Sequence, residues 1–88
     1  MTPKEWEERL HAEGFKRTYV WEDPPLTQYP DHTHDVLTAL VILEGEISVT
    51  IEGKTRTYKP GDRFDVSPET VHSARMGPQG CRYIIGEE

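Results

Sequence analysis

The sequence has little of several features that would assign it to familiar protein classes. It has a single cysteine, Cys81, in 88 residues, so no disulfide can form within the chain, which is typical of a reducing compartment. It has no apolar run near the ~20 residues that a membrane-spanning helix needs. Its first residues also lack the basic and then apolar pattern of a secretory signal. We therefore expect a cytoplasmic protein without a membrane partner.

Basic residues are also scarce, because 10 Lys and Arg stand against 16 Asp and Glu, for a net charge of −6. Nucleic acids and anionic membrane surfaces attract basic patches, so we expect no nucleic-acid partner. The length fits one domain. So short a chain has a marginal core, which a bound metal, a partner subunit or a closed barrel would help to stabilise.

The first fifteen residues predict a short α-helix that packs against a sheet. Thr2 can cap it, Pro3 suits the first helical position, and Glu5 completes a capping box. Gly14 is a natural end for the helix. The side chains expected to pack on the sheet are Trp6, Leu10 and Phe15.

From residue 16 onward the apolar residues recur with the period of two that is typical of strands. The segment 47–52 alternates cleanly, and the short turn at Gly53 indicates an antiparallel hairpin. Short strands between turns rich in Gly and Pro predict an all-β sandwich or barrel over 16–88, after the helical segment 1–15. The expected turns include 44–46 and 77–80. The expected strands are 17–22, 27–31, 32–43, 47–52, 55–58, 63–66, 71–76 and 81–85.

Three of the four histidines fall at two places in the chain. His32 and His34 are two residues apart, so on a strand their rings leave the same face, and His72 lies on a different expected strand. Imidazole is the commonest metal ligand, and three histidines leave open positions for water or substrate. Taken alone, the pair is equally well explained by surface or structural histidines.

Several motifs, in their order and spacing, resemble the cupin family. They are YPDHTH at 29–34, VILEGE at 41–46, YKPGD at 58–62 and VSPETVH at 66–72. The resemblance implies an antiparallel double-stranded β-helix, a jelly-roll-like barrel, with a metal ion inside it. It also implies that His32, His34 and His72 are the ligands of a divalent transition metal, with Fe, Mn, Ni and Zn all open.

The sequence departs from the family pattern at Thr38, where a glutamate ligand is usual. If a strand runs unbroken from His32, Thr38 points into the same cavity, although a hydroxyl is a poor metal ligand. Three neutral imidazoles would leave the full charge of +2 on the metal, which favours an anionic ligand. The ligand set resembles that of the family's iron-dependent thiol dioxygenases. Asp31 and Asp35 have the opposite strand parity, but one of them could orient a ligand histidine.

Three functions remain open at this point. The first is a small metalloenzyme acting on a small acid, thiol or sugar derivative, for which the sequence identifies no catalytic residue. The second is a non-catalytic domain that binds or senses a small and possibly anionic molecule. The third is a structural domain with unused histidines, for which Thr38 is the best argument. Strand edges need cover, and the family commonly dimerises, so we expect a homodimer with Tyr19, Val20 or Trp21 near the contact.

Overall fold

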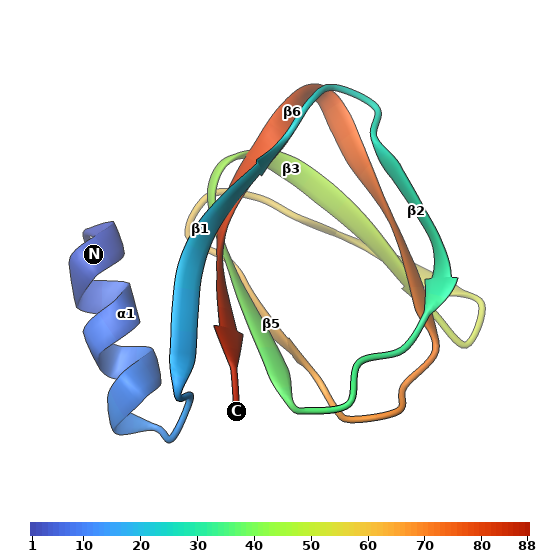
Figure 1. Cartoon of the computed structure of the whole chain (residues 1–88). Helices are drawn as coiled ribbons and strands as arrows, with labels where there is room; N and C mark the ends of the chain where they lie inside the picture. The colour runs from blue at the N-terminus through green and yellow to red at the C-terminus, as the bar shows by residue number, and fades with distance from the viewer.

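A computed structural model describes all of residues 1–88 and contains one helix and six strands (Figure 1). The prediction of an all-β antiparallel fold with a short N-terminal helix is confirmed. No helix has the length and hydropathy of a membrane span. The elements are α1 (Pro3–Ala12), β1 (Arg17–Asp23), β2 (Gln28–His32), β3 (Thr38–Ile51), β4 (Lys54–Tyr58), β5 (Arg63–Val66) and β6 (His72–Glu87).

Two long strands, β3 and β6, organise the sheet. They pair with each other in antiparallel register along most of their length, and both have irregularities midway, around Ile42–Ile47 of β3. Strands β1 and β2 pair with β6, whereas β4 and β5 pair with β3. The two long strands bend, so each reaches two partners, and the sheet wraps around an interior (Figure 1).

The expected turns at 44–46 and 77–80 are wrong, because both segments lie inside the long strands. Gly45 and Gly80 adopt positive φ values of 75° and 77°. A Cβ atom on Gly45 would collide with the backbone carbonyl of Gly80. These glycines therefore let two bent strands pass close to each other, as glycines at bulges do, and they do not end the strands.

The expected strand over 32–43 is also wrong, because it is interrupted. Strand β2 ends at His32, a loop follows, and β3 begins at Thr38. The parity that linked Thr38 to His32 therefore does not exist. The position of Thr38 is therefore set by β3, of which it is the first residue.

The helix begins and packs as the sequence predicts. The Glu5 amide donates to Thr2 Oγ1 at 3.2 Å, and the Thr2 amide donates to Glu5 Oε1 at 2.9 Å, which completes the capping box. Figure 1 shows α1 on the outside of the barrel, next to β1. Leu10 is fully buried there. Its buried cluster also contains Phe15, Ala39, Val41 and Ile84, with Trp6 packed against it.

Candidate metal centre and cavity

The three histidines of the expected metal site lie together. His32 and His72 are direct partners in the antiparallel pairing of β2 with β6, and His34 follows in the loop after β2. The candidate ligand atoms of the three side chains all lie within 4.8 Å of one another. The ring centroids are 4.1 Å apart for His32 and His72, 4.9 Å for His34 and His72, and 5.1 Å for His32 and His34. One metal ion could contact all three imidazoles at this spacing.

Backbone carbonyls orient two of these rings. The Nδ1 atom of His32 lies 2.7 Å from the carbonyl of Pro30, and Nδ1 of His72 lies 2.9 Å from that of Thr70. A carbonyl can only accept, so each Nδ1 carries the proton, and each Nε2 keeps its lone pair for a metal. Neutral nitrogen donors of this kind fit a divalent transition metal. Neither Asp31 nor Asp35 takes this role, since neither makes a side-chain hydrogen bond to a ligand histidine.

His34 is held in the form that binds metals. Burial lowers the pKa of its imidazole, and the nearby His72 and His32 lower it further. The neutral ring is therefore favoured near neutral pH. The carbonyl of His34 accepts a hydrogen bond of 2.9 Å from the amide of Glu69. This bond ties the loop that carries His34 to the loop that precedes His72.

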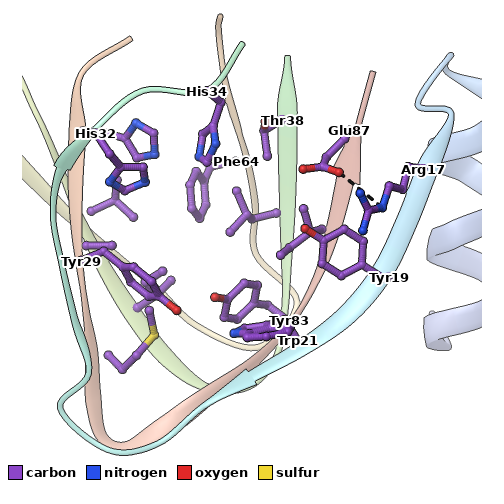
Figure 2. Close-up of a pocket in the computed structure, with 17 residues that line it drawn as sticks. Arg17, Tyr19, Trp21, Tyr29, His32, His34, Thr38, Phe64, Tyr83 and Glu87 are labelled. Atoms are coloured by element: carbon purple, nitrogen blue, oxygen red, sulfur yellow. Dashed lines mark ion pairs between the residues drawn. The ribbon is translucent and has the colours of Figure 1, made fainter. Parts of the chain in front are cut away.

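A cavity of about 330 Å³ lies beside the histidines (Figure 2). Thr38 is buried and is one of the residues that line it. Its hydroxyl donates to the carbonyl of Val36 at 3.1 Å. Most of the other lining is apolar and comes from Leu40, Ile47, Val49, Phe64, Ala74, Met76 and Ile85.

Sequence analysis missed a buried carboxylate behind the opposite side of the cavity. Asp23 is 5% exposed. Its Oδ1 accepts hydrogen bonds from the Tyr29 hydroxyl at 2.7 Å and the Trp21 indole at 3.0 Å, and its Oδ2 accepts one from the Tyr83 hydroxyl at 2.6 Å. Burial and the contact with Asp23 raise the pKa of both tyrosines, so both keep their protons. In the sequence, Asp23 precedes two prolines and looks like an ordinary turn residue.

The rim of the cavity carries its only charged lining side chains, those of Arg17 and Glu87. Arg17 Nε lies 3.6 Å from Glu87 Oε1. The guanidinium of Arg17 also lies 4.9 Å from the centre of the Tyr19 ring. Arg17 is mostly exposed and Glu87 is half-buried, so this pair sits between the cavity and solvent (Figure 2).

A family model described as "Cupin domain" matches residues 19–84 of this chain. No curated protein sequence matches it. Among solved structures, it is similar to a protein of unknown function from Rhizobium leguminosarum, with 21% identity and a TM-score of 0.75 over 80% of this chain and 66% of that one. A cupin-2 domain protein from Shewanella frigidimarina shares 17% identity, with a TM-score of 0.69 over 80% of this chain and 67% of that one.

The DMSP lyase DddQ from Ruegeria pomeroyi is also similar, with 26% identity and a TM-score of 0.73 over 81% of this chain. This chain covers 36% of DddQ, so the likeness concerns one part of that enzyme. The similarity to these structures confirms the jelly-roll barrel expected from the sequence.

Proposed function

This chain belongs to the cupin family, and on that basis we propose that it binds a divalent transition metal through His32, His34 and His72 and uses it to hold a small molecule in the cavity. The observation that carries the proposal is the convergence of three imidazoles within 4.8 Å, two of them with Nδ1 already bonded to a carbonyl. A bound Fe, Mn, Ni or Zn ion would supply open coordination positions and a Lewis acid.

The surroundings of the histidines indicate what kind of molecule would bind. No carboxylate joins the three imidazoles, so the charge of a bound metal would favour an anionic group on the ligand. The rest of the cavity is mainly apolar. This combination suits a small acid or thiol with an apolar body better than a sugar, whose hydroxyls would need more hydrogen-bond partners.

Metal analysis tests the first part of this proposal. We expect about one equivalent of a transition metal per chain after reconstitution. His72→Ala should weaken binding more than about 100-fold, because loss of a ligand exceeds the 10–100-fold effect of losing an outer partner. His11→Ala is the matched control, since His11 lies on α1 and bonds to Phe15 and Thr18. Less than about one-tenth equivalent in the wild-type protein would favour a structural domain with unused histidines.

Turnover separates an enzyme from a binding domain. Two observations favour the non-catalytic alternative. The only carboxylate that lines the cavity, Glu87, is paired with Arg17, and the raised pKa values of Tyr29 and Tyr83 keep both hydroxyls protonated. An enzyme would form product from a panel of small acids and thiols, with oxygen present, and lose this activity in folded His72→Ala. A binding domain would show saturable binding without product. Absence of oxygen uptake with every thiol would exclude a thiol dioxygenase.

We also propose that the protein is a cytoplasmic homodimer. The outer edge of β1 carries no neighbouring strand. Val20 and Trp21 on β1 are 38% and 49% exposed, but Tyr19 and Trp21 both line the cavity, so Val20 is the best placed of the three at a contact. The single thiol, Cys81, is buried and free, as suits a reducing compartment. A monomeric mass by light scattering at micromolar concentration would contradict the dimer.

A further inference from the structure

The two ends of the cavity differ in charge. At one end, three histidines can hold a metal cation. Behind the other end lies the Asp23 carboxylate, which accepts hydrogen bonds from neutral groups and takes part in none of the four ion pairs of the protein. A buried carboxylate without a cationic partner leaves a negative potential around it.

The tyrosine hydroxyls present hydrogen-bond acceptors to this end of the cavity. Tyr29 and Tyr83 both line the cavity, and Figure 2 shows their hydroxyls turned toward each other, away from His34. Each hydroxyl has one proton and donates it to Asp23. Only their oxygen lone pairs remain, so these two groups can accept a hydrogen bond from a ligand but cannot donate one.

The two ends are close enough for one small ligand to reach both. The ring centroids of Tyr29 and His32 are 6.2 Å apart, and the Tyr29 hydroxyl points away from His32 (Figure 2). Phe64 lies beside His34 (Figure 2), and most of the remaining wall of the cavity is apolar. A ligand of about ten non-hydrogen atoms fits a cavity of this size.

We propose that Asp23, Tyr29 and Tyr83 form a subsite, here called the tyrosine end, for a hydrogen-bond donor on the ligand, either a hydroxyl or an ammonium group. The inference rests on the proposed function, in which the histidine end holds an anionic group. The ligand is then a small bifunctional molecule, with a metal-binding anion and a donor separated by an apolar body. A purely structural network would tie β1, β2 and β6 together without discriminating between ligands.

Three probes with the same metal-binding group test the tyrosine end. We would titrate the zinc-loaded protein with benzohydroxamate and its 4-methyl and 4-hydroxy derivatives, by calorimetry. Methyl and hydroxyl groups have similar size, so a difference in affinity between these two compounds reports the hydrogen bond made by the 4-hydroxyl group. We expect the 4-hydroxy compound to bind at least about tenfold more tightly than the 4-methyl compound, since a site built around polar groups rejects an analogue that lacks the matching group.

Variants then assign the preference to the tyrosines. In Tyr29→Phe the ratio of the two affinities should fall toward one, because one of the two acceptor oxygens is lost and only that of Tyr83 remains. Tyr58→Phe is the matched control, because Tyr58 stacks on Phe64 at 4.2 Å but does not line the cavity. Equal affinities for the two compounds in wild type, or an unchanged ratio in folded Tyr29→Phe, would overturn the subsite and leave the metal proposal standing.

Absence of hydroxamate binding would contradict the proposed function but would leave the subsite untouched. A second measurement, which needs no metal, tests the subsite in that case. The indole N–H of Trp21 donates to Asp23, so its NMR resonance reports on the tyrosine end. In metal-free protein, n-butylammonium should shift this resonance saturably, and butyrate should not. The same small shift from both salts would refute the subsite.

Discussion

The two faces of the β3 and β6 pair differ in how completely they are filled. On the helix side, Ala39 and Val41 are fully buried, together with Leu10. On the opposite side, the alternate residues Thr38 and Leu40 line a cavity of about 330 Å³. Successive side chains of a strand point to opposite faces, so neighbouring residues of β3 have different roles. One face stabilises the fold, and the other leaves space for a ligand.

This comparison predicts that substitutions of equal size have unequal consequences on the two faces. A close-packed face tolerates neither a cavity nor an extra group. A face that borders empty space tolerates extra atoms, but it then loses binding volume. Stability and binding should therefore respond to different residues, even where those residues are adjacent in the sequence.

The largest expected effect is on stability, from Leu10→Ala on the helix side. Leu10 is fully buried between α1 and the sheet. Its truncation should lower the free energy of unfolding by about 3 kcal/mol, within the range for buried leucines. Metal affinity should stay within about twofold, since the histidines lie on the other side of the sheet. Urea unfolding and metal titration measure the two quantities.

The control for this variant is Leu26→Ala, because Leu26 is 53% exposed and should change stability by less than about 0.5 kcal/mol. A similar loss of stability in both variants, or a large loss of metal affinity in folded Leu10→Ala, would mean that the two faces are not independent.

The next effect comes from a matched pair that adds the same atoms to each face. Ala39→Leu should destabilise the protein by about 1–3 kcal/mol, because it overpacks a filled cluster. Ala74→Leu places the larger side chain into the cavity and should cost less than about 1 kcal/mol. It should instead weaken binding of benzohydroxamate to the zinc-loaded protein about tenfold. Equal destabilisation by both substitutions would contradict the comparison.

Local pattern was enough to predict the helix and the alternation of the strands, whereas the meeting of the histidines also needed the likeness to a known family. The capping box involves only residues 2–5, and period two fixes the two faces of a strand. His32 and His72 could be placed together through the likeness to a known family, and their register in β2 and β6 agrees. These features depend on short stretches of chain or on a shared motif.

Features that depend on contacts between distant segments could not be predicted in this way. Gly45 was interpreted as a turn because its neighbour across the sheet, Gly80, is distant in sequence. Asp23 was missed because its partner Tyr83 is 60 residues away. Thr38 was placed in the cavity by an argument from an unbroken strand, and the interruption between β2 and β3 removes that argument.

The smallest expected effect concerns the ion pair that fastens the end of the helix to the barrel. Both Nη atoms of Arg63 donate to the carboxylate of Glu13, at 2.7 and 2.9 Å. This hydrogen bonding lowers the pKa of Glu13 below its ordinary value of 4.5. The pair therefore stabilises the folded state above about pH 4.5, and this contribution disappears as the pH falls through the lowered pKa.

Since both partners are partly exposed, Glu13→Gln should lower the free energy of unfolding by no more than about 1 kcal/mol at pH 7. At pH 3 the difference from wild type should shrink, because protonation of Glu13 removes the same charge that the substitution removes. Urea unfolding of the metal-free proteins at both pH values measures this difference. Glu8→Gln is the control, because Glu8 is an exposed residue of the same helix. A difference that is equal at both pH values would show that the charge of Glu13 does not contribute to stability through Arg63.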